Sequence, residues 1–426
     1  MAIVAVVDSG LNLQHVDLAP RLWRNPGEVA NNGIDDDGNG VVDDIHGVDV
    51  ITGQALRDDP NGHGSHCAGI VAATSAGAEL MGIRLLGADG SGSFSDAISA
   101  WNYALLNGAN VISNSWGGPV SPNSLNALAT IVAIGEERFG AVFVAAAGNE
   151  ATNTDQVPHS PSGLPGVLAV GASDDLGNRA SFSNFGASTV DLFAPGVQIL
   201  SADAFSNSGR VRFSGTSMAT PVVAGALAAL ADANPQATPI QLKQTVLDSV
   251  VPRQALQGLA VSGGVLTNTF TGAFTAPLSS DLSGAAPIVP PSPSSGGSSG
   301  RRARRGRNGR RSVAGKAICV VDDPSNKASI NALLNRRDST LDVEWPAAFG
   351  NRICILSFNP KQDNFKAVRK RLKRTGLFES VERDAIVTIA AATEPQAATG
   401  VPPADPWPSI PGVEASALDG QAVLPI

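Results

Sequence analysis

This sequence has few of the features that cross-link a chain or hold it in a membrane. Three cysteines in 426 residues do not make a disulfide framework. No stretch reaches the roughly 18 uncharged apolar residues of a transmembrane helix, so we expect no membrane segment. The first apolar run is short and lacks a basic region, so we expect no secretory signal within the sequence. The compartment stays open: the cytoplasm for a complete chain, the exterior for an incomplete or rearranged one.

A serine stands at the predicted start of a buried helix. Ser217 follows Gly215 and Thr216, and an Ala/Val/Leu-rich segment continues from Val222 to Leu230. The first N–H groups of a helix have no partner within it and favour negative charge nearby. A serine there can attack a carbonyl while these N–H groups hold the developing oxyanion. By itself, the pattern fits a helix cap without chemistry equally well.

Two other segments supply the groups that a nucleophilic serine needs. The apolar run from Ala2 to Val7 predicts a buried parallel strand, and Asp8 follows it. Open α/β sheets place their sites at this end of a strand. His63 begins a segment of small residues that predicts a helix. Asp, His and Ser in this order provide an orienting carboxylate, a base and a nucleophile.

These motifs resemble those of the subtilisin-like serine proteases (subtilases) over about residues 1–268. The resemblance implies a doubly wound α/β fold with a mostly parallel sheet. It also implies that Ser217 is the nucleophile, His63 the general base and Asp8 its orienting partner, with Asn149 donating to the oxyanion. We expect His66 to be structural and Cys67 to be a small buried residue. The matching segments are Asp8-Ser9-Gly10, His63-Gly64-Ser65-His66-Cys67-Ala68-Gly69, Ala146-Ala147-Gly148-Asn149 and Gly215-Thr216-Ser217-Met218-Ala219-Thr220-Pro221.

The segment Ser115-Trp116-Gly117 resembles the substrate-binding strand of the same family. Such a strand pairs with the main chain of an extended peptide, so the expected partners are polypeptides of broad sequence. We expect Trp116 to be partly exposed beside a pocket; the alternative is core packing. We expect the protein to be a monomer.

Composition divides the chain into four parts. Residues 1–275 form the predicted catalytic domain, residues 276–312 a Pro/Ser/Gly-rich and then Arg-rich linker, residues 313–394 a second, smaller domain, and residues 395–426 a Pro-rich tail. Residues 301–311 contain seven arginines, which could bind nucleic acid or be cleaved. We favour a solvated linker and expect no nucleic-acid partner.

Residues 313–394 predict a small α+β domain of the ferredoxin-like class, with element order βαββαβ. Its expected strands cover residues 316–321, 341–345, 352–358 and 381–389, and its helices residues 329–336 and 365–375. Residues 376–384 resemble the end of the subtilase propeptide, which implies a self-cleaving zymogen with its own inhibitor. That family places the propeptide first, so the chain looks circularly permuted, by nature or by construction. An incomplete or rearranged gene is the alternative.

Charge favours docking between these parts. Residues 1–300 hold 10 Lys and Arg against 25 Asp and Glu, whereas residues 301–394 hold 20 against 10. Opposite charges steer association; the alternative is an accidental asymmetry with a mobile C-terminal domain. We predict that this domain packs on the substrate-binding face and that residues 390–399 lie in the cleft near Ser115.

An acidic segment between residues 31 and 44 predicts a calcium site. Its oxygen ligands alternate around glycines, although the bidentate Glu of an EF-hand is missing. A solvated acidic turn is the alternative. The expected ligands are Asp35, Asp37, Asn39, the Val41 carbonyl and Asp43.

We therefore interpret the sequence as a serine endopeptidase that acts through an acyl-enzyme and is inhibited by its own C-terminal domain. Two alternatives stay open. A transpeptidase or peptide cyclase would use the same triad, and an added amine nucleophile would reveal it. A non-catalytic peptide-binding relative would fail to react with a serine-directed phosphonate.

Overall fold

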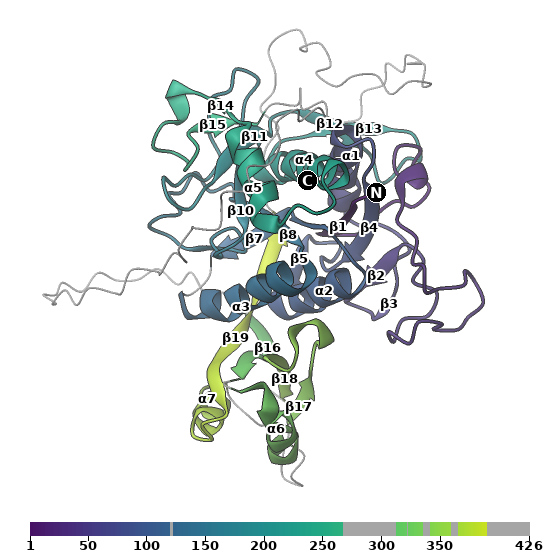
Figure 1. Cartoon of the computed structure of the whole chain (residues 1–426), viewed down its shortest axis with the longest axis vertical. Helices are drawn as coiled ribbons and strands as arrows, with labels where there is room; N and C mark the ends of the chain where they lie inside the picture. The colour runs from purple at the N-terminus through teal and green to yellow at the C-terminus, as the bar shows by residue number, and fades with distance from the viewer. Residues whose placement is uncertain (120–121, 267–311, 322, 335–340, 359–364, 390–426) are drawn as a thin grey trace, which may run out of the picture.

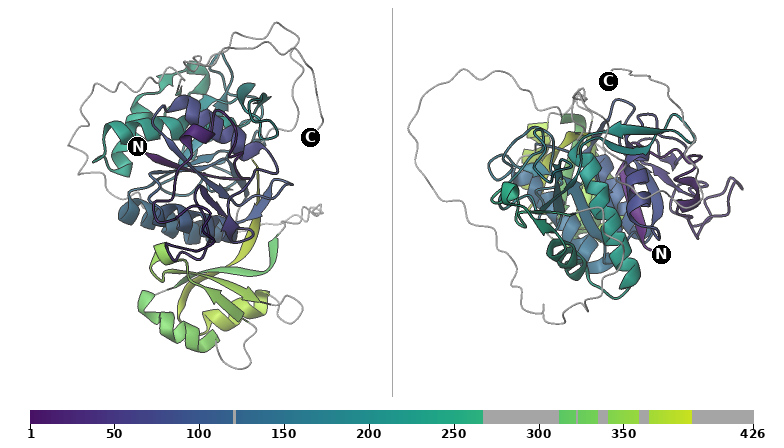
Figure 2. Two further views of the ribbon diagram at one scale, coloured as in Figure 1. Left: turned by 90° about the vertical axis from the view of Figure 1, so that its right-hand side faces the viewer. Right: turned by 90° about the horizontal axis from the view of Figure 1, so that it is seen from above.

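The computed structural model describes residues 1–119, 122–266, 312–321, 323–334, 341–358 and 365–389. The predicted tail and all of the predicted linker except Ser312 lie outside these residues. Figure 1 shows a larger part, built from residues 1–266, with a smaller part, built from residues 312–389, beneath it; Figure 2 shows the same arrangement from two other sides.

The larger part is built on a ten-stranded sheet in the order β14-β15-β11-β10-β8-β6-β1-β4-β2-β3. Every neighbouring pair is parallel except the two at the edges, β14 with β15 and β2 with β3. The strands are β1 (Ile3–Asp8), β2 (Gly47–Asp49), β3 (Gln54–Ala55), β4 (Glu79–Arg84), β6 (Val111–Asn114), β8 (Val142–Ala146), β10 (Leu168–Ser173), β11 (Leu192–Pro195), β14 (Val251–Pro252) and β15 (Gly264–Val265).

Helices cover both faces of this sheet, so its strands are apolar on both sides. On β1, Val4 and Val6 face one apolar cluster, whereas Ala5 and Val7 face another. The first cluster contains α1 (His63–Thr74), α4 (Thr216–Ala233) and α5 (Pro239–Asp248); the second contains α2 (Phe94–Leu106) and α3 (Pro122–Phe139). The predicted doubly wound, mostly parallel sheet is confirmed.

Helix α4 is the central core helix. Its length and composition would let it cross a bilayer, but 78% of that stretch is buried inside the protein. It contacts α1 and five strands of the sheet. Such burial is typical of a core helix in a globular domain.

Short elements surround the sheet. They are the strands β5 (Ser91–Ser93), β7 (Trp116–Pro119), β9 (His159–Ser160), β12 (Ile199–Ala202) and β13 (Arg210–Phe213), and the 3-10 helices Ala19–Arg21 and Gln254–Leu256.

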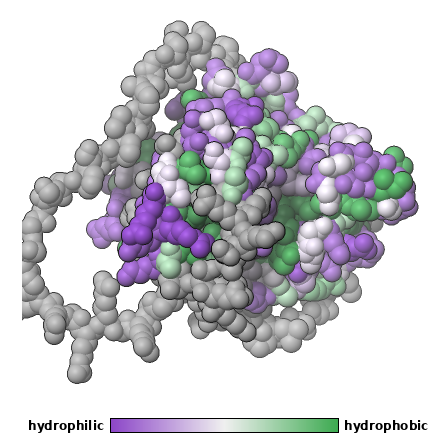
Figure 3. All heavy atoms as spheres, turned by 90° about the horizontal axis from the view of Figure 1, so that it is seen from below, coloured by the Kyte–Doolittle hydropathy of each residue, from purple (hydrophilic) through white to green (hydrophobic). Residues whose placement is uncertain are grey.

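The smaller part is an antiparallel sheet in the order β17-β18-β16-β19, with two helices on one face. Its elements lie within a few residues of the predicted ones; its class stays a prediction. The helix face is the end of the molecule seen from below in Figure 3, where hydrophilic side chains predominate. The elements are β16 (Ser312–Val321), the 3-10 helix Pro324–Asn326, α6 (Lys327–Leu334), β17 (Leu341–Glu344), the 3-10 helix Ala347–Phe349, β18 (Ile353–Phe358), α7 (Phe365–Lys373) and β19 (Phe378–Ile389).

The two faces of this smaller sheet have different partners, because strand residues alternate. Cys319 and Cys354 face the cluster that contains residues of α6 and α7. Ile318 and Ile355 belong instead to the same cluster as Trp101 of α2. The helices α2 and α3 are therefore covered by sheets on both sides.

Candidate active site

Asp8 and His63 meet at the end of β1 and the start of α1. The Asp8 Oδ1 atom lies 2.8 Å from Nδ1 of His63, and both side chains are buried. Gly62 precedes the helix in the left-handed conformation, with φ of 95°, which favours glycine. This turn directs His63 toward the carboxylate.

A second buried carboxylate holds the two segments together. Asp59 accepts hydrogen bonds from the hydroxyls of Ser9, at 2.7 Å, and Ser65, at 2.8 Å. The Ser9 hydroxyl in turn accepts from the Gly64 N–H at 2.9 Å. Asp59 therefore fixes the residues that follow Asp8 and His63. Sequence reasoning did not find it, because Asp59 lies outside the histidine motif.

Ser217 lies in the first turn of α4, fully buried, and its hydroxyl donates to the Ser115 carbonyl at 2.8 Å. The Nε2 atom of His63 is buried and has no hydrogen-bond partner among the residues that the structure covers. In free enzymes, catalytic hydrogen bonds are often long or unmade. His63 therefore has a free ring nitrogen for the serine proton.

Two opposing influences act on the charge of His63. Burial lowers the pKa of His63, but the Asp8 carboxylate and then Cys67 outweigh it, and the pKa lies well above its ordinary value. Burial also raises the pKa of the Cys67 thiol, which lies 3.8 Å from Nδ1 of His63. The Asp8 contact stabilises the imidazolium that forms when His63 accepts a proton.

Asn149 is positioned by the same helix as the serine. Its side-chain carbonyl accepts the Thr216 N–H at 2.9 Å, and the Thr216 hydroxyl accepts the Gly148 N–H at 3.2 Å. Because its oxygen accepts this bond, the NH2 end of the Asn149 amide is the end that can donate. This is the group that the sequence analysis assigned to the oxyanion.

His66 contacts the backbone and a ring of neighbouring strands. Its Nε2 atom lies 3.1 Å and 3.0 Å from the carbonyls of Ile199 and Val211, and its ring stacks on Phe213. Burial is the main cause that lowers its pKa to about 3. His66 therefore stays neutral and joins α1 to β12 and β13.

The predicted substrate strand, Ser115 to Gly117, is already paired. Thr388 of β19 lies opposite Gly117, and Ile389 lies opposite Trp116, in antiparallel register. On its other side β19 pairs with β5, where Ile386, Val387 and Thr388 oppose Ser93, Gly92 and Ser91. Figure 1 shows β19 running from the smaller part past α3 to these strands.

One predicted role in this strand is wrong. Trp116 is fully buried: its indole N–H donates to the Val7 carbonyl at 2.8 Å, and its ring lies against Trp101 and Phe94. The backbone of Trp116 borders the space between β5 and β7 that β19 fills, which we call the groove. Its side chain enters the core, because the aromatic cluster of α2 lies directly behind the strand. Trp116 therefore supports the groove instead of bordering a pocket.

The second wall of the groove was missed by sequence reasoning. It is formed by β5 and by Gly90, the residue before it, whose carbonyl accepts the Ile389 N–H at 3.0 Å. A Cβ atom on Gly90 would come within 2.7 Å of the Ile389 side chain. The small residues from Gly90 to Ser93 were the available signal. Residues 390–399, predicted to lie in the cleft, are outside the described residues; the strand observed there is the end of β19.

The predicted metal ligands lie in one loop but do not all converge. Glu28, Asp35 and Asp37 each offer an oxygen atom, and these atoms lie within 4.8 Å of one another. Asn39 joins Asp37 through its side-chain amide at 3.0 Å. Asp43 instead accepts the N–H groups of Asn32 and Gly33. Glu28 was not predicted, because it precedes the acidic motif.

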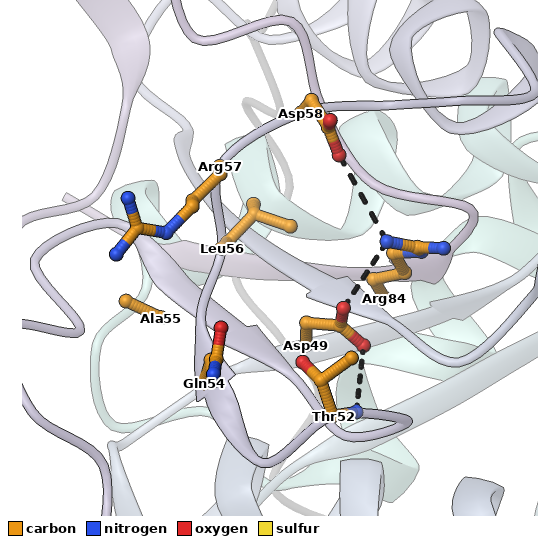
Figure 4. A pocket seen from close by; sticks show the side chains of 8 residues that line it. All are labelled: Asp49, Thr52, Gln54, Ala55, Leu56, Arg57, Asp58 and Arg84. Carbon is orange, nitrogen blue, oxygen red and sulfur yellow. Dashed lines mark hydrogen bonds and ion pairs between the residues drawn. The ribbon is translucent and has the colours of Figure 1, made fainter.

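A cavity of about 200 Å³ lies beside β2 and β3, apart from the triad (Figure 4). Arg84 crosses it, 3.1 Å from Asp49 and 3.9 Å from Asp58. Its charged groups neutralise one another, and it gives no reason to assign a ligand there.

Comparisons with known proteins match the larger part. The profile of the subtilase family covers residues 1–272. Thermitase of Thermoactinomyces vulgaris is 34% identical over 250 residues, which are 56% of this chain and 78% of thermitase. The extracellular serine proteinase of Thermus sp. (strain Rt41A) is 36% identical over 253 residues, which are 58% of this chain and 54% of that protein.

One solved structure and one further relative are also subtilisin-like proteases. The crystal structure of a cold adapted subtilisin-like serine proteinase superposes with a TM-score of 0.52 at 30% identity, covering 63% of this chain and 88% of that one. Subtilisin-like protease 2 of Pseudogymnoascus destructans is 37% identical over 53% of this chain and 51% of that protein. The chain thus spans about half the length of two of these curated relatives. None of these matches favours the transpeptidase or the non-catalytic alternative.

Proposed function

The chain belongs to the subtilase family, and from this premise we propose that it is a serine endopeptidase held latent by its own C-terminal part. The observation that carries the activity is the buried contact of 2.8 Å between Asp8 and His63, with Ser217 at the start of α4. The observation that supports latency is the pairing of β19 with both β5 and β7.

In the proposed reaction, Ser217 attacks the substrate carbonyl and His63 takes its proton at Nε2. The Asp8 carboxylate holds Nδ1 and stabilises the imidazolium, which then protonates the leaving amine. The NH2 group of Asn149 and the Ser217 N–H stabilise the oxyanion; a donor of this kind is worth about 10²–10³ in rate. Water then hydrolyses the acyl-enzyme.

The geometry of β19 supports an occupant that blocks substrate. An extended peptide binds such a groove by adding a strand between its two walls. β19 uses both walls and ends at Ile389, opposite Trp116, one residue from the Ser115 carbonyl that accepts the Ser217 hydroxyl. A substrate main chain and β19 therefore compete for the same hydrogen bonds.

Polar contacts away from the groove support docking of the same part. Asp384, on β19, accepts the N–H of Ser95 at 3.0 Å and its hydroxyl at 2.6 Å, in the first turn of α2. A carboxylate at a helix N-terminus is favourable because the N–H groups there lack partners. Lys316 lies 3.5 Å from Asp96 in the same turn.

Two further contacts join the other end of the interface. The Ala348 N–H donates to the Asn102 side chain at 2.7 Å, and the Ala348 carbonyl accepts from Arg138 at 3.3 Å. Together with Val387, which is fully buried, they support a fixed orientation of the smaller part on α2 and α3.

We interpret the smaller part as a ferredoxin-like, propeptide-like domain, and the chain as a self-cleaving zymogen in permuted order. Its strand order is that of a split βαβ unit. We propose a monomer that acts on polypeptides.

The test is a chain with a site for a sequence-specific protease inserted in the Gly/Ser-rich segment near residue 297. Uncut, it should hydrolyse a small peptide slowly. Cut and diluted, it should gain activity, more so at high salt, because surface charge attraction is screened. The matched control carries the same insert with a scrambled recognition sequence. Equal activity of cut and uncut chains would contradict inhibition, and a Ser217 that resists a phosphonate probe after cutting would contradict the protease assignment.

We also propose that the acidic loop binds calcium through Glu28, Asp35 and Asp37, with Asn39 beside them. Three carboxylates of this kind repel one another unless a cation joins them, and hard oxygen ligands are those that calcium takes. The ion would hold the loop that continues into β2.

Calcium removal should lower the melting temperature of the Ser217→Ala chain, and added calcium should restore it. Glu28→Gln should abolish most of this response. Asp36→Asn is the matched control, since Asp36 accepts the Val29 N–H and lies outside the carboxylate group. If neither the chelator nor added calcium changes the melting temperature, the acidic loop is a solvated turn without a bound ion.

A further inference from the structure

The smaller part holds two of the three cysteines of the chain, Cys319 on β16 and Cys354 on β18. The antiparallel register places them directly opposite each other. Both are fully buried in the apolar cluster of the smaller part. Directly opposed residues of antiparallel strands have Cα atoms about 4.5–5.5 Å apart, which lies inside the span of roughly 4.4–6.8 Å that a disulfide bridges.

The two thiols already interact. They lie opposite each other on the same face of the sheet, and burial, followed by the neighbouring Cys354 thiol, raises the pKa of the Cys319 thiol well above its ordinary value. The third cysteine, Cys67, lies beside His63 in the larger part. Cys319 and Cys354 are therefore the one pair of cysteines in this chain that can join without rearrangement.

We propose that Cys319 and Cys354 form a disulfide bond when the chain folds in the presence of a low-molecular-weight disulfide, and that this bond prolongs latency. The second half rests on the proposed inhibition by the smaller part. One protein thiolate attacks the oxidant's S–S bond, which gives a mixed disulfide and releases one thiolate. The other protein thiolate attacks the bound protein sulfur and releases the second. Two electrons and two protons pass from the protein thiols to the oxidant, which leaves as two thiols.

Burial determines when this exchange occurs. Only a thiolate reacts, and an apolar surrounding disfavours it. The bond therefore forms while the smaller part is folding or transiently open, and reductants reach it only in the same state. The link joins β16 to β18 across α6 and β17, so it restricts the unfolded chain and leaves the docked contacts unchanged. We expect the open population to fall about 100-fold, and proteases that attack the open form to act correspondingly more slowly.

The bond is tested on the full Ser217→Ala chain, which cannot digest itself. The chain is unfolded in denaturant and refolded with oxidised glutathione or with a reductant. With the oxidant, its mass should fall by two hydrogens, and a peptide that joins Cys319 to Cys354 should appear. The matched control carries Cys319→Ala and Cys354→Ala in addition, which keeps small apolar side chains at both positions. Three alkylatable thiols after oxidative refolding would overturn the proposal.

The locking role is tested by limited trypsin digestion of the same samples. The fragment that spans both cysteines should survive about 100-fold longer with the bond than without it, and the control should not respond to oxidant. Equal survival would overturn the locking role. A chain that retains Ser217 should show a longer lag before peptide hydrolysis when oxidised. If that chain shows no lag in either state, the proposed inhibition fails, while the mass result still decides the disulfide.

Discussion

The larger and smaller parts of this protein place their buried acidic groups differently. In residues 1–266, Asp8 and Asp59 lie inside the domain, where Asp8 contacts His63 and Asp59 binds the hydroxyl of Ser9. In residues 312–389, the buried acids among the described side chains are Glu382 and Asp384, and both lie on β19. β19 is also the strand that leaves its own sheet to pair with β5 and β7. The larger part thus keeps its buried acids in its interior, whereas the smaller part keeps them on the strand through which it contacts the larger part.

The largest expected effect removes the interior chemistry. Ser217→Ala should reduce hydrolysis by the cut, activated chain about 10⁴–10⁶-fold. The loss of one hydroxyl leaves the packing of α4 intact, so the melting temperature should change little. Initial rates on a small peptide measure this effect. His63→Ala should cost about as much, and a Ser217→Ala chain that still cleaves itself would refute the assignment.

The next effect removes the edge function while leaving the triad unchanged. Val387→Asp places a carboxylate at a fully buried position of β19. Because an unpaired charge is unfavourable there, the docked position of the strand should be destabilised and β19 should leave the groove. The uncut chain should then hydrolyse a small peptide about 10–100-fold faster than the unmodified chain. Glu379→Ala is the matched control, because Glu379 lies on the same strand with its side chain 58% exposed. If the uncut Val387→Asp chain hydrolyses the peptide as slowly as the unmodified chain, inhibition does not depend on β19.

A smaller change tests the junction of the two parts. Asp384→Ala removes the acceptor of two hydrogen bonds from Ser95 at the start of α2. Loss of such a capping acceptor costs about 1–2 kcal/mol. The dissociation constant of the two parts of the cut chain should therefore rise roughly 5–30-fold. The concentration at which the cut parts reassociate gives the measurement, again with Glu379→Ala beside it. If the cut parts reassociate at the same concentration as those of the unmodified chain, Asp384 does not stabilise their contact.

The smallest effect concerns the larger part alone and depends on pH. Burial raises the pKa of Asp191 to about 6, against the hydrogen bond from the Ala169 N–H and the charge of Lys243. The folded state therefore holds a proton that the unfolded state releases near pH 4. Stability from this group is full below pH 4 and is lost as the pH rises through 6.

Asp191→Asn should therefore raise the free energy of unfolding by about 1–3 kcal/mol at pH 8 and by little at pH 4. Denaturant titrations in the Ser217→Ala background measure it at both values. Asp175→Asn, at an exposed position, should have no such pH dependence. The same gain at both pH values would show that the carboxylate charge is not responsible.

The sequence predicted the interior of the larger part better than the edge of the smaller one. Asp8, His63 and Ser217 each stand at a strand end or a helix start with a recognisable motif, so the local pattern sufficed to place them in the fold. Trp116 was misjudged because a short strand does not reveal which side its side chain occupies. The register of β19 depends on how two domains meet, and no local pattern encodes it.

Groups that act from outside a motif were missed for the same reason. Glu28 reaches the acidic loop from a preceding turn, and Asp59 reaches Ser9 across the histidine loop. Cys319 and Cys354 are far apart in the sequence and become neighbours only through strand pairing.

The direction of β19 has a consequence for how the proposed latency would end. Its last residues enter the groove, while its first residues continue into the smaller part and, through the linker, into the larger part. A cut after Ile389 would therefore release only the segment that follows. The blocking strand would stay joined to the enzyme, and dilution could not lower its local concentration. With the linker intact, activation of this chain would then be a first-order event set by opening within one molecule, with a half-time independent of how much protein is present.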